Sequence, residues 1–292
     1  MTGMKFGMAL FGMSPRHYAE IARAAEENGF ESAWIPEHLV FPAQMPPTYP
    51  YSESGLPAVS TATALYDPWV VLGYLAHATQ SIRLGTEVFI LPLRHPVATA
   101  RSVVTVDRLS GGRVTVGVGV GWLEAEFETV GQSFHDRGSR TDEIIPLLRR
   151  LWTEDTIEHE GDHFRFGPVR FEPKPVQKPC PPIEVGGTTP AALRRAGRLG
   201  DGWIEVGARD LDELQEKLAV IERHRREAGR DHLPFEVTTA SGLAQDRDSV
   251  RRCRDAGVTR IVAAPPLATG RPVPGDVVDW IKRVADDLIA GV

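Results

Sequence analysis

The sequence LSGGRVTVGVGVGW, at residues 109–122, decides the fold of this chain. Gly111 and Gly112 can take left-handed backbone angles, which end a helix. The β-branched residues of segment 113–118 then predict a buried strand. Glycines alternate along the end of this strand, and a backbone without Cβ atoms lets a large ligand come close. The stretch therefore predicts one unit of an α/β barrel that holds a flat ligand at its open end.

The composition of the chain excludes several kinds of function. Its 292 residues are 42% hydrophobic, which suits either two domains or one large α/β barrel. The formal net charge is -6 and no basic block is present, so we expect no nucleic-acid partner. Cys180 and Cys253 have no metal-ligand spacing and no histidine pair has it either, so we expect no metal site. So few cysteines fit a reducing cytoplasm.

The first residues do not have the pattern of a targeting segment. Residues 4–13 are apolar, but Gly7 and Gly12 interrupt them and no cleavage-like end follows. They predict a first strand and not a signal peptide. No apolar run approaches the roughly 20 residues that cross a bilayer. We therefore expect a cytoplasmic protein that does not bind membranes.

Strand patterns and helix patterns alternate along the whole chain. The predicted strands are residues 5–10, 32–35, 82–90, 113–118, 182–185, 202–206, 235–240 and 259–263. The predicted helices are residues 18–28, 67–79, 97–109, 139–152, 190–199, 210–228, 249–256 and 276–289. Eight strand–helix units predict the α/β class and a TIM (β/α)8 barrel, in a single domain that spans residues 1–292.

Two segments interrupt the alternation. Segment 40–66 is rich in proline and follows the second strand, so it leaves the C-terminal end of a strand. Loops at that end lie over the active face of a barrel, and long loops are often lids. We therefore expect a lid in which Tyr49, Tyr51 and Tyr66 line a pocket. Segment 153–179 precedes the fifth strand and predicts a hairpin with a proline-rich arm, to which we assign no chemistry.

Two strand ends carry acidic residues where barrel enzymes place their working groups. Glu37 and His38 follow the second strand, where His38 can act as an acid or base near neutral pH. The residues leave a second interpretation open, in which Glu37 caps a turn and His38 packs under the lid. Glu87 in the third strand must either pair or contact a ligand, because burying a bare carboxylate is costly. The residues alone favour an ion pair with Arg94 or Arg113.

The end of the fifth strand predicts an anion-binding loop. Gly186 and Gly187 expose backbone N–H groups, Thr189 can cap the next helix, and Pro190 suits its first turn. The positive end of the helix dipole lies at this loop, which favours a phosphate. An ordinary capped helix start is the alternative interpretation.

Glu184 and Glu205 suggest a different class of enzyme. Both are acidic residues in predicted strands, and a pair of carboxylates can hydrolyse a glycosidic bond. The sequence gives no spacing between them and places no aromatic side chains for stacking on a sugar. A hydrolase is therefore the less favoured alternative.

Five motifs occur in a specific order along the chain. They are GFESAWIPEH at 29–38, IRLGT at 82–86, LSGGR at 109–113, VGVGVGW at 116–122 and PPIEVGG at 181–187. In this order they resemble the bacterial luciferase-like superfamily, and specifically its branch of F420-dependent oxidoreductases. The resemblance spans about residues 5–206, and the last quarter of the chain is similar only as further barrel units.

The resemblance implies a TIM barrel with a flavin or deazaflavin at the top. The ring is expected against the second to fourth strands, with a non-proline cis peptide bond between Glu87 and Val88. His38 is expected nearest the reacting carbon, with Glu37 orienting it. The implied cofactor contacts are His38, Glu87, Val88, Val120, Gly121, Trp122, Gly186, Gly187, Thr188 and Thr189.

The cofactor decides the reaction that the resemblance implies. Reduced FMN reacts with oxygen and makes a monooxygenase, whereas a 5-deazaflavin resists oxygen and carries a hydride. Val120 stands where the luciferase has a basic phosphate contact, which favours F420 over FMN. Arg137, Arg140 and Arg209 are candidates for contacts with the acidic F420 tail.

The sequence therefore predicts an F420-dependent oxidoreductase that moves a hydride between the deazaflavin and a small organic substrate. By the same resemblance we expect a homodimer. One alternative is an FMN-dependent monooxygenase supplied by a partner reductase. Another is a flavin-binding barrel without catalytic activity.

Overall fold

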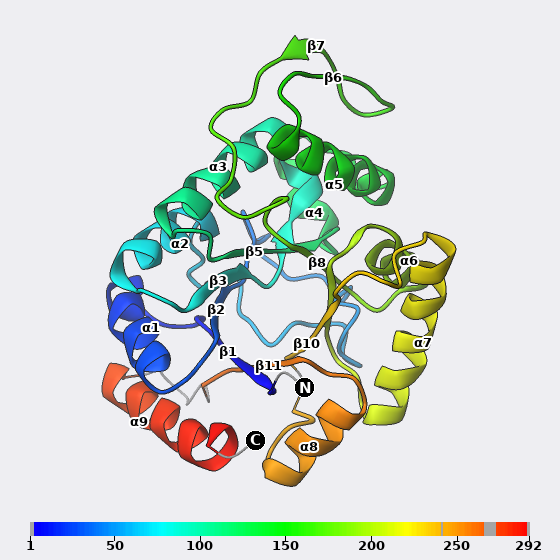
Figure 1. Ribbon diagram of the computed structural model, residues 1–292. Coiled ribbons are helices and arrows are strands. Elements are labelled where there is room, and N and C mark those ends of the chain that lie inside the picture. The colour runs from blue at the N-terminus through cyan, green and yellow to red at the C-terminus, as the bar shows by residue number, and fades with distance from the viewer. Residues whose placement is uncertain (1–2, 241, 266–272, 291–292) are drawn as a thin grey trace.

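The computed structural model describes residues 3–240, 242–265 and 273–290. Parallel strands in this part of the chain close into a barrel of eight positions with helices around it (Figure 1), so the TIM-barrel prediction is confirmed. Pairing of β3 with β5 completes the ring. The barrel strands are β1 (Lys5–Ala9), β2 (Ser32–Ile35), β3 (Arg83–Thr86) with β4 (Phe89–Ile90), β5 (Val114–Gly119), β8 (Ile183–Gly186), β9 (Gly202–Glu205), β10 (Glu236–Thr239) and β11 (Arg260–Ala263).

The outer helices follow the predicted ranges within a few residues. They are α1 (Tyr18–Glu27), α2 (Pro68–Ala78), α3 (Pro96–Leu109), α5 (Arg137–Thr153), α6 (Pro190–Leu199), α7 (Leu211–Glu227), α8 (Arg247–Asp255) and α9 (Pro274–Val284). Local chemistry sets their starts: Thr189 accepts a hydrogen bond from the backbone of Ala192 (3.2 Å), with Pro190 in the first turn of α6. The structure adds α4 (Glu124–Thr129), which the sequence patterns did not predict.

The short elements complete this order. They are the 3-10 turns η1 (Pro15–His17) and η2 (Leu91–Leu93), and the π-helical turn η3 (Ala285–Ile289) that extends α9. The predicted strand 82–90 is divided into β3 and β4 by Glu87 and Val88, and the peptide bond between these two residues is cis, as the resemblance implied.

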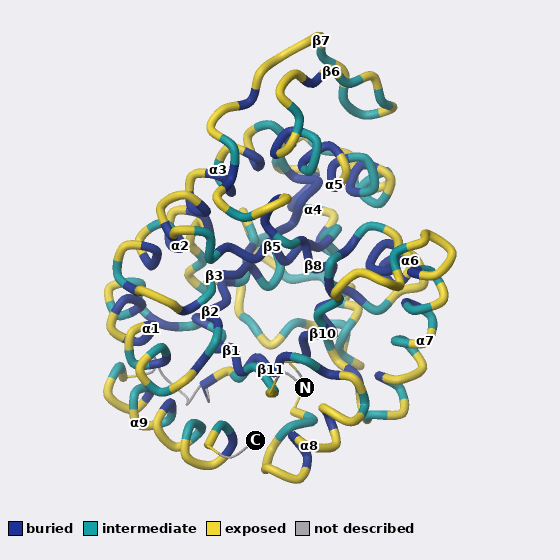
Figure 2. Tube along the Cα trace, in the orientation of Figure 1, coloured by how far each residue is buried: buried dark blue, intermediate teal, exposed yellow. Residues whose placement is uncertain are grey.

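Trp34 is a large side chain packed inside the barrel. Trp34 on β2 is fully buried and packs with Ile204 and Val262. A Cβ atom on Gly7 would lie 2.6 Å from the Trp34 indole, and one on Gly85 would lie 2.4 Å from it. The two glycines therefore provide the space for Trp34. Figure 2 shows the barrel strands buried and the outer surfaces of the helices exposed.

The two insertions lie in different places. Segment 40–66 contains only turns and bends, and it crosses the barrel end that lies away from the viewer in Figure 1. Segment 153–179 contains the predicted hairpin, formed by β6 (Ile157–Glu160) and β7 (Arg165–Val169). The hairpin projects beyond α3 and α5 at the edge of the molecule. Among the described residues, no helix combines the length and the apolar character needed to span a bilayer.

Candidate active site

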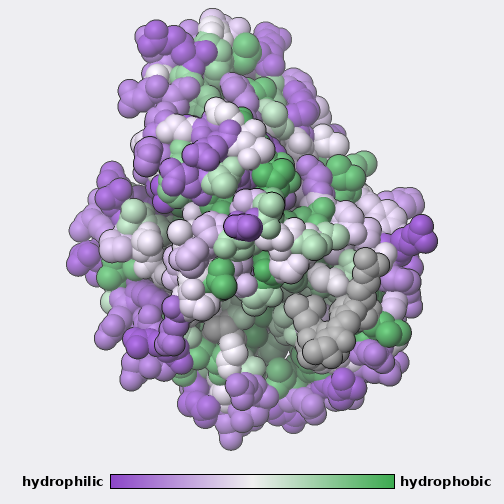
Figure 3. Space-filling model, turned by 180° about the vertical axis from the view of Figure 1, so that it is seen from behind, coloured by the Kyte–Doolittle hydropathy of each residue, from purple (hydrophilic) through white to green (hydrophobic). Residues whose placement is uncertain are grey.

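A cavity of about 910 Å³ opens at the C-terminal ends of the barrel strands. Its walls combine strand-end residues, such as Val88 and Val206, with segment 40–66, which contributes Tyr49 and Tyr51. Figure 3 shows the corresponding face of the molecule hollowed, with hydrophobic residues around the hollow. Ligand pockets are typically about 300–1,000 Å³ in volume, so the cavity has room for a tricyclic ring and part of its side chain.

Val88 forms part of the cavity floor, and two strand glycines make space for it. A Cβ atom on Gly119 would lie 2.6 Å from one methyl group of Val88, and one on Gly186 would lie 2.8 Å from the other. The sequence predicted that these glycines would expose bare backbone to a ligand. Gly119 and Gly186 do line the cavity, and Val88 fills the space beside them and adds an apolar surface that the sequence did not predict.

His38 faces the cavity with one ring nitrogen held by the protein. Its Nδ1 lies 2.9 Å from Oε2 of Glu126, whose side chain is fully buried on α4. The other carboxylate oxygen of Glu126 accepts a hydrogen bond from the backbone N–H of Leu39 (2.5 Å). Nε2 of His38 has no hydrogen-bond partner in the described part of the chain, so it is available to a ligand. A carboxylate bonded to one ring nitrogen, as Glu126 is here, fixes the tautomer and the orientation of an imidazole.

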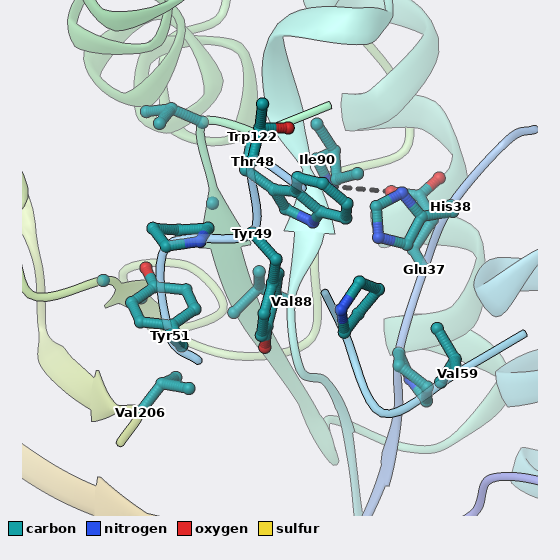
Figure 4. Close-up of a pocket in the computed structure, with 18 of the residues that line it drawn as sticks. Glu37, His38, Thr48, Tyr49, Tyr51, Val59, Val88, Ile90, Trp122 and Val206 are labelled. Atoms are coloured by element: carbon teal, nitrogen blue, oxygen red, sulfur yellow. Dashed lines mark hydrogen bonds between the residues drawn. The ribbon is translucent and has the colours of Figure 1, made fainter. Parts of the chain in front are cut away.

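Glu37 does not have the orienting role that the resemblance implied. Its carboxylate forms an ion pair with Arg94 and accepts a hydrogen bond from the backbone N–H of Ile90 (2.7 Å), drawn in Figure 4. Glu126 makes the contact with His38 instead. Burial raises the pKa of Glu37 to about 7, although Arg94 and the Ile90 N–H act in the opposite direction. Glu37 therefore anchors the end of β2 to the start of η2.

Aromatic side chains of the lid form one wall of the cavity together with Trp122, which follows β5. The ring of Trp122 lies 5.1 Å from that of Tyr49 and 5.9 Å from the imidazole of His38, and Figure 4 shows it between them. Tyr51 packs edge-on against Tyr49 at 5.4 Å. The predicted lining by Tyr49 and Tyr51 is confirmed. Tyr66 is not among the lining residues, because its ring packs against Tyr18 at 6.4 Å on the outside of the barrel.

The predicted anion-binding loop borders the same cavity. Gly186, Gly187 and Thr189 line it, while the backbone of Thr188 bonds to the Tyr51 hydroxyl. Gly187 has a φ of 113°, and a Cβ atom there would lie 3.3 Å from that hydroxyl. The loop therefore leaves room for a polar group beside it, and Tyr51 from the lid lies at this position.

The candidate contacts for an acidic tail differ in availability. Arg137 lines the cavity and bonds to the carbonyl of Gly121 (3.1 Å). Arg140 is buried, and its guanidinium is used by backbone carbonyls and by Asp136. Arg209 is exposed and paired with Glu213 (2.9 Å) outside the lining of the cavity. Of the three, only Arg137 is placed to meet a ligand in the cavity.

The carboxylate pair of the hydrolase alternative is used inside the protein. Glu184 accepts hydrogen bonds from Arg260 (2.7 Å) and Thr238 (2.9 Å), and Glu205 accepts one from Thr239 (2.7 Å). Both side chains are buried and neither lines the cavity. The structure therefore gives no support to a glycoside hydrolase.

The remaining predicted contacts lie at the cavity, and the residue that contacts His38 was missed. Glu87, Val120, Gly121 and Trp122 all line the cavity. Glu126 was missed because it lies in the acidic sequence of α4, where Glu124 and Glu128 are exposed and similar in pattern. Its neighbour in the sequence, Phe127, is a large apolar residue and was the available signal that this turn packs inward. In the structure Phe127 is fully buried.

Comparisons with known proteins agree with this geometry. The luciferase-like monooxygenase family matches residues 4–265. An uncharacterised protein of Mycobacterium tuberculosis is 35% identical over 259 residues, which cover 89% of this chain and 88% of that protein. The F420-dependent glucose-6-phosphate dehydrogenase of Amycolatopsis mediterranei is 28% identical over 294 residues, covering 98% of this chain and 81% of that enzyme.

Two further comparisons cover most of the chain. The FMNH2-dependent dimethylsulfone monooxygenase of Pseudomonas putida is 27% identical over 283 residues, covering 92% of this chain and 72% of that enzyme. The solved structure of the coenzyme F420-dependent tetrahydromethanopterin reductase from Methanopyrus kandleri has the same fold, with a TM-score of 0.76, 20% identity and 99% of each chain covered. The chain therefore belongs to the luciferase-like monooxygenase family, whose members include F420-dependent and FMN-dependent oxidoreductases.

Proposed function

We propose that this protein is an F420-dependent oxidoreductase that transfers a hydride between the deazaflavin and a small organic substrate. His38 carries the proposal, because its Nε2 faces a ligand-sized cavity while Glu126 holds its Nδ1. The relationship to an F420-dependent glucose-6-phosphate dehydrogenase supports the choice of cofactor. When bound, a deazaflavin supplies a hydride carrier that resists oxygen.

The residues around the cavity fit such a group. Val88 presents an apolar surface on the floor, and Trp122 and Tyr49 present aromatic surfaces on the wall. Flat apolar surfaces of this kind suit a tricyclic ring. Thr189, at the start of α6, would hold the phosphate with its backbone N–H group.

His38 would move the proton that accompanies the hydride. Oxidation of an alcohol to a carbonyl removes a hydride from carbon and a proton from oxygen. Nε2 of His38 would accept that proton, and it would return it to the oxygen when the reaction runs in reverse. Glu126 would stabilise the imidazolium formed in between, because its carboxylate lies 2.9 Å from Nδ1.

Segment 40–66 would exclude water from this chemistry. Its residues form the outer part of the cavity wall, including Phe41, whose ring lies 4.8 Å from that of His38. A dry site strengthens the electrostatic interactions between the imidazole and the substrate. The lid would therefore have to open for ligand entry and close before hydride transfer.

The test is an anaerobic titration of the purified protein with F420 and with FMN, each oxidised and reduced. We expect tight binding of F420 and absorbance changes when a panel of small alcohols, aldehydes and ketones is added. Tight binding of FMN with oxygen-dependent turnover would instead establish the monooxygenase alternative, which the relationship to the dimethylsulfone monooxygenase keeps open. Binding without turnover of any substrate would favour a flavin-binding protein. We also propose a homodimer in the cytoplasm, to be tested by sedimentation and by fractionation.

A further inference from the structure

Glu87 is a carboxylic acid on the cavity wall whose side chain has no partner among the residues that the structure describes. It follows β3, and its backbone N–H donates to the carbonyl of Ile35 (2.9 Å). Its side chain lines the cavity beside Val88. In the described part of the chain, no group forms a hydrogen bond or an ion pair with its carboxyl group. The carboxyl group is therefore available to a ligand.

The two arginines expected to pair with Glu87 are used elsewhere. Arg94 forms an ion pair with Glu37. Arg113 donates to Thr79 Oγ1 (2.8 Å) and to the carbonyl of Ala76 (2.8 Å) at the C-terminal end of α2. The ion pair with Arg94 or Arg113 that the sequence favoured is therefore wrong.

The charged groups around Glu87 disfavour a negative charge there. Glu184 on β8 and Glu205 on β9 are acidic, and Arg260 on β11 is basic. Arg260 is already engaged, because it donates to Glu184 (2.7 Å) and to Glu31 (3.1 Å). Other ionisable groups on the same cavity are Glu37, His38, Tyr49, Tyr51, Glu124, Glu128 and Arg137.

These surroundings determine the form of the side chain at neutral pH. The pKa of Glu87 is raised to about 8, chiefly by burial and also by the charges of Glu184 and Glu205, while Arg260 acts in the opposite direction. At pH 7 the group is therefore mostly the neutral acid, whose two oxygens offer an O–H donor and a C=O acceptor side by side. A ligand that offers only donors would leave the O–H unpaired, which is costly in a dry site.

We propose that Glu87 recognises the amide-like edge of the bound ring, donating its O–H to a ring carbonyl and accepting a hydrogen bond from the adjacent ring N–H. This inference rests on the proposed function, since it assigns a partner within the same cofactor. The pyrimidine edge of a flavin or deazaflavin carries a carbonyl next to an N–H, which matches a neutral carboxylic acid group for group. An ionised carboxylate would match only the N–H and would repel the carbonyl oxygen.

The test measures binding of the ring alone, without turnover. The probes are 5-deazariboflavin, which lacks the phosphate and tail, and its derivative methylated at the ring N–H. The proteins are the wild type, Glu87→Gln, Glu87→Ala and the control Glu216→Gln, which changes an exposed carboxylate on α7. Dissociation constants are measured by fluorescence titration from about pH 7 to about pH 9, across the range in which Glu87 ionises.

We expect the wild type and Glu216→Gln to lose about tenfold in affinity across this range, because the neutral fraction of Glu87 falls by that factor. Glu87→Gln, which stays neutral, is expected to bind within about threefold of the wild type at low pH and to lose the pH dependence. Methylation of the ring N–H should weaken binding to the wild type about tenfold and binding to Glu87→Ala much less.

Two results would overturn the inference. Glu87→Gln could keep the pH dependence of the wild type, or Glu87→Ala could discriminate against the methylated ring as strongly as the wild type does. Both results would leave the proposed function intact, since the ring would still bind. Failure of the wild type to bind either ring compound would instead remove the proposed function, and the inference with it. Thermal melts of each variant separate these outcomes from misfolding.

Discussion

The two ends of the barrel interior differ in how completely their charged side chains are paired. Toward the N-terminal ends of the strands, Arg260 is bonded to Glu184, Thr238 and Glu31, and every member is paired. At the C-terminal end, His38 has one free ring nitrogen and Glu87 has no partner in the described part of the chain. Paired charges of the first kind hold strands together, whereas unpaired polar groups at a cavity are available for ligands. The comparison therefore distinguishes side chains that stabilise the barrel from side chains that are available to bind a ligand.

The largest expected effect is at the cavity end, in His38→Ala. Loss of the imidazole removes the group that moves the proton, so turnover should fall by about 10²–10⁴-fold. Affinity for the cofactor should stay within about threefold, since His38 supplies little of the apolar wall. The control is His77→Ala, which changes an exposed histidine on α2. An unchanged turnover number in His38→Ala would show that the catalytic assignment is wrong.

The next effect is at the paired end, in Arg260→Met. The arginine is 2% exposed, and its removal leaves the buried carboxylate of Glu184 without its counter-ion. We expect a loss of about 3–5 kcal/mol in the free energy of unfolding, measured by urea denaturation. Cofactor affinity of the folded fraction should change little. A stability close to that of the wild type would mean that the paired network contributes specificity rather than stability.

Glu87→Gln, unlike Arg260→Met, should increase the free energy of unfolding. The pKa of Glu87 rises from its ordinary value of 4.5 to about 8 on folding, so the folded state holds a proton that the unfolded state releases between these values. The wild type therefore loses stability as pH rises through this window. Glutamine does not ionise, and we expect the variant to gain about 1–3 kcal/mol at pH 8 but almost nothing at pH 4, measured by thermal denaturation. A gain independent of pH would contradict the ionisation argument.

The smallest effect distinguishes positioning from chemistry in Glu126→Gln. The amide can still contact Nδ1 of His38, but it no longer carries the charge that stabilises an imidazolium. We expect turnover to fall about tenfold, with the Michaelis constant unchanged. Glu158→Gln, on the exposed hairpin, serves as the control. Equal losses in cofactor affinity and turnover would indicate a structural role for Glu126 instead.

The barrel could be predicted from the sequence because its signals are local. The β-branched residues of β5, Thr189 before Pro190, and the alternation of patterns each report on a few neighbouring residues. The cavity position of His38 followed from the same rule, since strand ends meet at one face of a barrel. These features depend on backbone geometry, which a short stretch of sequence specifies well.

The partners within the site could not be predicted in the same way. Glu126 lies 88 positions after His38 in the sequence, and Arg94 is also far from Glu37 along the chain. Neither pair is therefore visible in a local sequence pattern. The glycines of β5 and β8 line the cavity as predicted, but their packing against Val88, which lies between β3 and β4, was not predicted. Contacts between distant segments depend on side-chain packing, which requires coordinates.

The packing of Val88 links three separate parts of the chain. Its two methyl groups occupy the hollows at Gly119 and Gly186, so a methyl group added at either glycine would push the valine toward the ligand. Positions 88, 119 and 186 should therefore vary as a set: an alanine at one of the glycines would be tolerated when position 88 is itself smaller. A designer who wishes to make room for a bulkier ring would therefore begin with a smaller residue at position 88 and keep both glycines, because a side chain at either glycine works against the added space.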